Sequence, residues 1–395
     1  MKSRVIFVVI IIAMLASIVF AQAQRKHLNP MVDLLAEKKP VFGISPPTVA
    51  PPQNAERGGG GGGRGEAPAQ AAANPGPDMC GVVPPPPAPR GEGRGAGGRG
   101  PGGGGAARGG GGGGRGPAAN ALPQPSTVAE AAKMALAYGG ADYLFNGGFE
   151  GGVTDARINA FTEFMNAMKD AGNVSKAGVP HLTHPFALKT PSIAEIPDGY
   201  IQALSKELNA GASTLMFVDV DCAKELSAGL AAMRFKSKGG TRPDAVGPAP
   251  AIWGMNEAQY KQKADVWPLN PDGELVNWTI IESKEGLKNV RQIAAVKGIG
   301  VLWPGAGTLG GVFSTVQPDG TRKRDDVAWE NAIQTVLAAC KEFNLACGYP
   351  VSTPADVEMR MKQGFSVFVA QSWSQGSFDT IAAGRKLAGR PDKNQ

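Results

Sequence analysis

The sequence predicts an α/β fold, a (β/α)8 TIM-type barrel with a long Gly/Arg/Pro-rich insert after its first strand. Short apolar runs alternate with amphipathic segments along the chain, and together they make eight strand–helix units. Such alternation is typical of a parallel sheet. Outside the insert and the N-terminal segment about 290 residues remain, which suits a barrel of about 250. An open doubly wound sheet is the alternative, although no G-x-G-x-x-G turn follows the first strand.

Residues 1–23 have the pattern of a signal peptide. Two basic residues precede an apolar run from Val5 to Phe20, and Ala21 and Ala23 supply the small residues of a cleavage site. The run is short for a membrane-spanning helix, which needs about 20 residues. An uncleaved anchor is the alternative. We therefore expect an exported protein, either periplasmic or secreted.

Residues 46–125 form a low-complexity insert. Glycine and proline runs fill it, seven arginines are spread along it, and it contains no Phe, Tyr or Trp. Such a composition buries too little apolar surface to offset the entropy of ordering, so we expect disorder. Because aromatic stacking residues are missing, we expect no specific nucleic-acid partner and at most a weak electrostatic contact with an acidic surface. The barrel domain then comprises residues 24–45 and 126–395.

The strands are predicted from short apolar runs bounded by turn-forming residues. In chain order they span residues 40–44, 141–146, 179–184, 214–219, 276–281, 299–303, 345–349 and 366–370. The helices are predicted from apolar residues at helical spacing and from capping signals, such as Thr127 with Glu130. They span residues 31–37, 127–138, 154–171, 198–209, 223–235, 284–296, 325–343, a helix beginning at 354, and 378–387.

The chain has four cysteines, which are Cys80, Cys222, Cys340 and Cys347. None is spaced as C-x-x-C, which argues against a zinc or thioredoxin-like motif. In an oxidising compartment two of them can pair. Cys340 lies on the apolar face of a predicted helix, where a buried free thiol is the favoured interpretation.

In a barrel of this kind the chemistry takes place at the carboxyl ends of the strands. The positions predicted there are Ser45, residues 146–150 and 181–184, Asp219, Asp221, Glu282, residues 304–308, Tyr349 and Gln371. The insert leaves from the same end of the predicted barrel. The candidate site residues therefore come from this set.

Three segments together resemble the HpcH/HpaI aldolase/citrate lyase family. Residues 280–299, which begin Ile-Ile-Glu-Ser, resemble its strand ending in I-E-T and the helix that follows. Residues 234–235 with 239–242 resemble its R-[YF]-P-P-x-G-x-R-G segment, and residues 139–144 resemble its A-G-x-D-[FW] motif. The resemblance covers most of the chain from about residue 28, apart from the insert.

The resemblance implies a carbon–carbon lyase that binds a divalent metal ion, magnesium or manganese, and acts on a small 2-oxo or hydroxy acid. In such enzymes the metal stabilises the enolate formed on cleavage, and oxygen ligands suit it. Glu282 matches the family's metal-binding glutamate, and a surface or helix-capping carboxylate is the alternative. Family members commonly form dimers and hexamers, so we expect a homo-oligomer.

Several positions depart from the family pattern. Gly307 or Thr308 stands where the family has its second metal-binding aspartate, and residues 146–151 contain no histidine where the family has D-x-E-H. The arginine that ends the family's third strand falls near Thr183. Asp219 ends the strand next to that of the predicted metal ligand, so it can supply the missing carboxylate.

Three further residues are candidates for catalysis. His181 or His184 can act as the general base, since histidine titrates near neutral pH; a structural histidine is the alternative. Arg242 can bind a carboxylate or phosphate through two hydrogen bonds, or else order the Trp-bearing segment 236–275. The sequence thus favours an aldolase with an altered active site. A non-catalytic binding protein on the same barrel is the alternative, and a surface protein that works through its Arg/Gly insert is a third.

Overall fold

The computed structural model describes residues 27–49, 80, 122–176 and 180–390. The predicted signal peptide lies outside the described residues, and so does most of the predicted insert. Within the described ranges, no helix is long and apolar enough to cross a bilayer.

Eight parallel strands close into a barrel. They are β1 (Val41–Ile44), β2 (Tyr143–Asn146), β5 (Phe186–Lys189), β6 (Thr214–Phe217), β8 (Leu275–Ile281), β9 (Val301–Pro304), β12 (Ala346–Pro350) and β13 (Val367–Ala370). Each strand pairs with the next in this order, and β13 returns to β1 with Val41 opposite Val367. The pairing of β6 with β8 completes the ring. The predicted (β/α)8 fold is confirmed.

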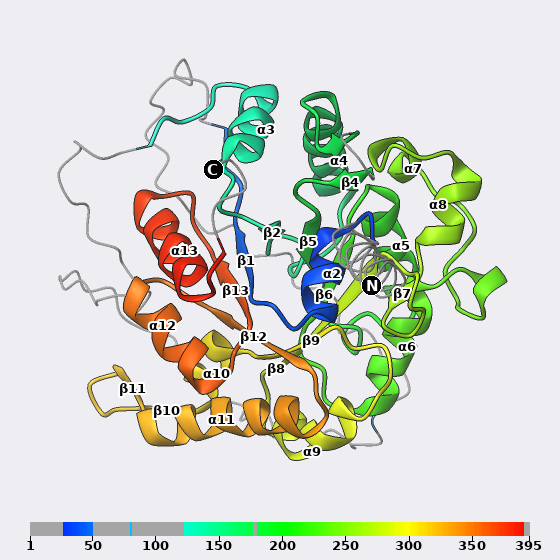
Figure 1. The fold of residues 1–395 in the computed structure, drawn as a ribbon. Coiled ribbons are helices and arrows are strands. Elements are labelled where there is room, and N and C mark those ends of the chain that lie inside the picture. The colour runs from blue at the N-terminus through cyan, green and yellow to red at the C-terminus, as the bar shows by residue number, and fades with distance from the viewer. Residues whose placement is uncertain (1–26, 50–79, 81–121, 177–179, 391–395) are drawn as a thin grey trace, which may run out of the picture.

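Helices follow the strands and pack around the barrel, as Figure 1 shows. The larger ones are α3 (Val128–Ala137), α4 (Asp155–Asp170), α5 (Tyr200–Asn209), α6 (Ala223–Met233), α9 (Lys284–Ala294), α11 (Asp326–Glu342), α12 (Pro354–Gln363) and α13 (Gln375–Leu387). Most begin at a side chain that accepts a first-turn N–H, which satisfies an otherwise unpaired donor. These caps are Thr127, Thr154, Ser283, Asp325, Thr353 and Ser374.

Smaller elements fill the connections between these units. The helices among them are η2 (Lys236–Lys238), α7 (Ala249–Ile252), α8 (Glu257–Lys263) and α10 (Ala306–Val312). The strands are β3 (Val174–Ser175), β4 (His181–Leu182), β7 (Val266–Trp267), β10 (Ser314–Val316) and β11 (Arg322–Arg324). Of these, β7 extends the main sheet beside β8, while β3–β4 and β10–β11 are separate antiparallel pairs.

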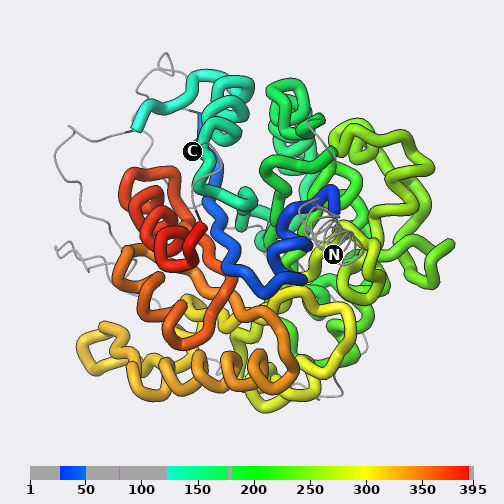
Figure 2. Tube along the Cα trace, viewed as in Figure 1, coloured from blue at the N-terminus to red at the C-terminus, as the bar shows by residue number. Residues whose placement is uncertain are grey.

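The barrel interior is filled by large side chains and closed at one end by the N-terminal helix. Tyr143 packs edge-on against Trp278, whose ring centroid lies 5.1 Å from that of Trp303. Helix α2 (Pro30–Ala36) adds Met31 and Val32 to this cluster, and both are fully buried. Figure 2 shows the blue N-terminal segment crossing this end of the barrel. Because α2 leads directly into β1, it covers the amino ends of the strands and leaves the carboxyl ends open.

A buried carboxylate joins the first barrel strand to the last helix. Asp142, which is 1% exposed, accepts a hydrogen bond from the Phe42 N–H at 2.9 Å. It also pairs with Arg385 at 3.1 Å and Arg390 at 2.7 Å. The charged pairs connect α13 and the segment after it to the start of β2. A carboxylate this buried is stable only when it is paired and hydrogen-bonded.

The cysteines form two disulfides, Cys80–Cys222 and Cys340–Cys347. The prediction of a free thiol at Cys340 is therefore wrong. Cys340 lies near the end of α11 and Cys347 in the next strand, and the turn between them brings their Cα atoms to 5.7 Å. That distance is within the range that a disulfide spans.

Candidate functional site

A cavity of about 530 Å³ opens at the carboxyl ends of the barrel strands. Apolar side chains from inside the barrel form its floor: Phe145, Met216, Ile280, Trp303 and Val369. Polar side chains gather around it: Ser45, Glu150, Lys189, Glu282, Thr308 and Gln371. An apolar cavity with a few convergent polar groups is the usual form of a small-molecule site. It lies where the sequence predicted the chemistry.

Glu282 is the buried carboxylate of this cavity. It directly follows β8 and is only 3% exposed. Its Oε1 accepts a hydrogen bond from the backbone N–H of Asp219 at 3.1 Å. On its other side lies Gly305, where an added Cβ would stand 2.3 Å from the Glu282 Cβ and 2.7 Å from Oε2. The glycine therefore makes the space that the carboxylate occupies.

Asp219 lies directly behind Glu282, in the loop after β6. Its φ of 49° is a left-handed conformation that few residues other than glycine adopt. Burial, and then the negative charge of Glu282, raises the pKa of Asp219 to about 6. Glu195, Asp221 and Glu150 add to the same effect. The Asp219 side chain does not line the cavity, so the structure places it next to the predicted metal ligand without bringing it to the cavity wall.

This concentration of carboxylates fits a hard divalent cation. Mg²⁺ and Mn²⁺ favour carboxylate oxygens, and Glu282 presents one at the cavity. Burial is the main cause of the raised pKa of Asp219, and repulsion by its acidic neighbours adds to it. A bound cation would relieve that repulsion. The donor set is therefore compatible with the expected metal, with Glu282 as the carboxylate that lines the cavity.

Lys189 is a site residue that the sequence analysis missed. It is the last residue of β5, it lines the cavity, and its Nζ lies 2.7 Å from Oε1 of Glu150. Only β6 lies between β5 and β8, so Lys189 places a positive charge two strands away from the strand that carries Glu282. The signal was present in the sequence, since Phe-Ala-Leu-Lys at 186–189 is an apolar run with a cation at its carboxyl end.

The third barrel strand lies later in the chain than predicted, and this moves both histidines away from the cavity. The strand was expected at residues 179–184 but is β5, Phe186–Lys189. His181 instead lies in β4, opposite Ser175 of β3. Pro185, which has no backbone N–H to donate to a neighbouring strand, lies between β4 and β5. His181 and His184 therefore precede β5 at the amino ends of the barrel strands, opposite the cavity, so their expected position at the mouth is wrong.

His184 has a structural environment. It is 2% exposed, and its Nε2 lies 3.1 Å from the carbonyl oxygen of Tyr138. Its backbone N–H donates to Oδ1 of Asn173 at 2.9 Å. The neighbouring Leu182 N–H donates to the carbonyl of Leu28, just before α2. These bonds tie the β3–β4 pair to the closed end of the barrel.

Arg242 is likewise buried away from the cavity. Its Nη2 donates to Oδ1 of Asn209 at 2.7 Å and to the hydroxyl of Tyr260 at 3.2 Å. Its guanidinium carbon lies 4.3 Å from the ring centroid of Phe235. Asn209 ends α5, which leads into the start of β6, so this cluster lies near the amino ends of the strands. The alternative role, an arginine that orders the segment 236–275, agrees with this position.

Part of the chain matches a known protein family. Residues 193–379 match the model of the HpcH/HpaI aldolase/citrate lyase family. The matched region runs from before β6 into α13 and includes Glu282. The predicted resemblance is thereby confirmed.

The chain is also similar to individual proteins. It is 25% identical over 241 residues to a hydroxypyruvate/pyruvate aldolase of Paraburkholderia phytofirmans, covering 60% of this chain and 80% of the aldolase. A solved HpcH/HpaI family protein from Burkholderia cenocepacia J2315 is 23% identical, with 66% of this chain and 90% of that one covered and a TM-score of 0.47. A citrate lyase beta subunit from M. tuberculosis, solved with oxaloacetate and magnesium, is 19% identical, with 67% and 92% covered and a TM-score of 0.37.

Proposed function

We propose that this protein is a metal-dependent carbon–carbon lyase of the aldolase type, acting on a small 2-oxo or hydroxy acid. The observation that carries the proposal is the buried Glu282 carboxylate at the carboxyl end of β8, which lines a cavity of about 530 Å³. The match of residues 193–379 to the HpcH/HpaI aldolase/citrate lyase family supports it. So does the similarity to a hydroxypyruvate/pyruvate aldolase.

Glu282 would hold the metal ion, and Asp219 is the candidate for the second carboxylate. The ion, magnesium or manganese, would supply a positive charge that stabilises the enolate of the substrate. The N–H of Asp219 fixes one oxygen of Glu282, and Gly305 leaves the space that the carboxylate needs. These contacts hold the Glu282 carboxylate in one orientation before metal or substrate binds, and a catalytic site requires such preorganisation.

Lys189 would bind the carboxylate of the substrate. Its ammonium group lies at the cavity wall and pairs with Glu150 at 2.7 Å. The apolar floor, which includes Phe145 and Trp303, excludes water from the reacting carbons. No histidine lines this cavity within the described residues, and a carboxylate is our candidate for proton transfer. Glu150, at the rim beside Lys189, is best placed to move a proton at the substrate.

The second candidate function is a non-catalytic binding protein on the same barrel. The observation that favours it is the set of replacements around the cavity: Gly307 and Thr308 line it where the family has an aspartate. Both histidines lie at the other end of the barrel. In that case the same cavity binds a small acid without turning it over.

Enolisation separates the two candidates. The full protein with Mn²⁺ is incubated with pyruvate in deuterated water, and deuterium at the methyl group is followed by NMR. A lyase exchanges these protons, and Glu282→Gln abolishes the exchange. Glu285→Gln, the same change on the outer helix α9, is the matched control and keeps it. Pyruvate that binds to the wild-type protein without any exchange would establish the binding protein instead.

We also propose that the protein is exported. The signal-peptide pattern of residues 1–23 motivates this, and the two disulfides support it because such bonds persist in oxidising compartments. The intact mass of the protein recovered from the periplasm or medium tests it. A mature chain that begins at Gln24 is expected, and full-length protein retained in the cytoplasm would contradict the proposal.

A further inference from the structure

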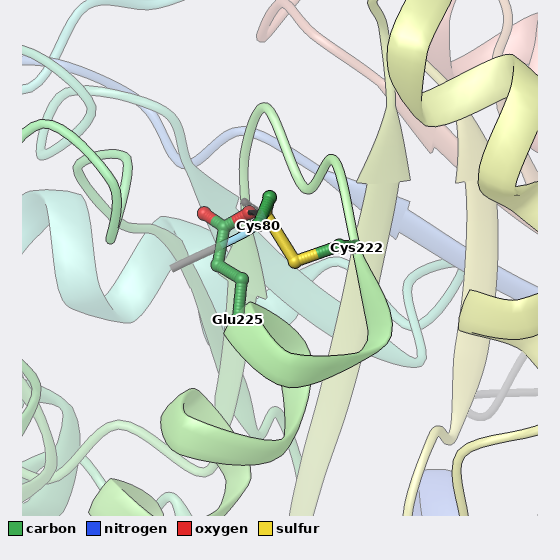
Figure 3. Close-up of side chains that lie close together, drawn as sticks. All are labelled: Cys80, Cys222 and Glu225. Atoms are coloured by element: carbon green, nitrogen blue, oxygen red, sulfur yellow. Dashed lines mark hydrogen bonds between the residues drawn. A yellow bond between two sulfur atoms is a disulfide. The ribbon is translucent and has the colours of Figure 1, made fainter. Parts of the chain in front are cut away.

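A second cluster of metal-binding residues lies outside the cavity, around the Cys80–Cys222 disulfide (Figure 3). Cys222 is the N-cap residue of α6, and Glu225 lies in the first turn of that helix. Figure 3 shows the Glu225 side chain extending from this turn toward the two sulfur atoms. Oε2 of Glu225 lies 3.9 Å from Sγ of Cys80. The three potential ligand atoms all lie within 4.8 Å of one another.

The carboxylate of Glu225 is buried beside the disulfide. It is fully buried, and its Oε1 has no hydrogen-bond partner in the described part of the chain. Its Oε2 accepts the N–H of Asp221 at 3.0 Å. Burying a carboxylate with one oxygen unsatisfied costs free energy, and a disulfide offers that oxygen no donor. A cation bound by Oε2 and the two sulfurs would offset the negative charge of this buried carboxylate.

We propose that reduction of the Cys80–Cys222 disulfide converts Cys80, Cys222 and Glu225 into a site for a thiophilic divalent metal ion such as Zn²⁺. A dithiol reductant supplies two electrons and two protons, which turn the disulfide into two thiols, and is itself oxidised to a disulfide. The thiols lose their protons when the metal binds, so the ion is held by two thiolates and one carboxylate. A water molecule supplies the fourth ligand of a tetrahedral site. The oxidised and metal-bound forms exclude each other.

The geometry requires only a small movement. In a tetrahedral zinc site, Zn–S bonds of about 2.3 Å and Zn–O bonds of about 2.1 Å place sulfur and oxygen ligands roughly 3.6 Å apart and two sulfurs roughly 3.8 Å apart. The distance of 3.9 Å from the Cys80 sulfur to the Glu225 oxygen is already close to this. The two sulfurs have to separate by little more than one bond length, which rotation about their side-chain bonds provides.

The surroundings favour a cation and connect this site to the cavity. The Asp221 and Asp219 carboxylates lie near enough to act on Glu225 electrostatically. The Ser283 hydroxyl donates to Oδ1 of Asp221, and the Asp219 N–H donates to Glu282. Residues 218–222 therefore form one loop that contacts Glu282 at the cavity and also carries Cys222 of the disulfide. The ligands differ, however, because thiolates select Zn²⁺ whereas the cavity offers the oxygen ligands that Mg²⁺ and Mn²⁺ prefer.

Co²⁺ is the probe, because a thiolate ligand gives it an intense charge-transfer absorption. The full-length protein carries Glu282→Gln, which removes the cavity carboxylate. It is reduced with a phosphine, which takes oxygen from water and delivers the electrons and protons to the disulfide. The phosphine is then removed and Co²⁺ is titrated without oxygen. We expect one equivalent of thiolate-bound Co²⁺ in the reduced protein, none in the oxidised protein, and displacement by Zn²⁺.

Three variants complete the test. Cys80→Ser with Cys222→Ser abolishes the absorption, and Glu225→Gln weakens Co²⁺ binding by about tenfold or more. Cys340→Ser with Cys347→Ser, the matched control, leaves it unchanged. If the variant with serine at positions 80 and 222 does not fold, the reduced control variant is alkylated instead. Its remaining thiols are those of Cys80 and Cys222, so alkylation should abolish the Co²⁺ absorption in the same way. A folded, reduced protein without thiolate-bound Co²⁺ overturns the proposal, as does absorption that survives in the Cys80 and Cys222 variant.

Discussion

The backbone N–H of Asp219 donates a hydrogen bond to Oε1 of Glu282 across 3.1 Å. The two residues follow neighbouring strands of the barrel, β6 and β8, which pair with Phe217 opposite Thr279. The loop after one strand therefore orients the carboxylate at the end of the next. The orientation of the Glu282 side chain therefore depends on the conformation of two loops and on the glycine at position 305.

The first prediction concerns metal binding at the cavity. Glu282→Gln should reduce Mn²⁺ affinity by about a hundredfold or more, because it replaces the carboxylate that lines the cavity with a neutral amide. Asp219→Asn should reduce it less if only the backbone N–H of Asp219 matters, and equally if its carboxylate is a ligand. Isothermal titration calorimetry measures both. Mn²⁺ affinity that is unchanged in Glu282→Gln would rule out the cavity as the metal site.

The second prediction uses two glycines of the same segment. Gly305→Ala should displace the Glu282 carboxylate, because the new Cβ would lie 2.7 Å from Oε2. Gly307→Ala is the matched control, since a Cβ there meets no atom within 4 Å. We expect Mn²⁺ binding to weaken by about tenfold or more in the first variant only, while both remain folded by circular dichroism. Equal Mn²⁺ affinities in the two variants would contradict this account of the site.

A third prediction tests Lys189 as the group that binds the substrate carboxylate. Lys189→Met removes the ammonium but keeps most of the apolar stem. A hydrogen bond to a charged group is worth about 1.5–3 kcal/mol, so the dissociation constant for pyruvate should rise by roughly ten- to a hundredfold. Lys206→Met is the control, because Lys206 pairs with Asp155 at 2.8 Å on the outside of the barrel. Pyruvate affinity that falls equally in both variants would remove Lys189 from the site.

The fourth prediction concerns acid stability through Asp265. Burial raises the pKa of this carboxyl, but hydrogen bonds from Arg234, Asn270 and the Val266 N–H together hold it below its usual value of 3.8. A depressed folded-state pKa means that its stabilisation is present above the unfolded pKa and is lost as the pH falls through the folded one. Asp265→Asn should therefore cost about 1.5–3 kcal/mol near neutral pH.

Urea unfolding at pH 7 and at pH 3 measures this effect. The difference in free energy of unfolding between the wild type and Asp265→Asn should be smaller at pH 3 than at pH 7. Asp244→Asn, an exposed carboxylate of the same segment, should show little difference at either pH. A difference for Asp265→Asn that stays constant across this range would mean that the charge of Asp265 is not what stabilises the fold.

Much of the fold could be predicted because local signals agreed with the tertiary structure. Seven of the eight predicted barrel strands lie within a few residues of the observed ones, and Thr127 caps a helix where expected. The third strand was misplaced because residues 179–184 and 186–189 are neighbouring short segments that each contain strand-forming residues. Only long-range pairing, with Leu144 opposite Phe186, selects the second. Because of this error, both histidines were predicted at the wrong end of the barrel and Lys189 was not predicted as a site residue.

The sequence by itself determined the barrel, its mouth and the position of Glu282, because periodicity, capping and strand ends are local properties of the chain. Tertiary structure alone decided which groups meet there. The Asp219 N–H reaches Glu282, Lys189 reaches Glu150, and four cysteines that allow three pairings take one of them. Cys340 and Cys347 are only 7 positions apart, but the other contacts join residues 39 to 142 positions apart. The proximity of these residues depends on closure of the barrel, which no local pattern encodes.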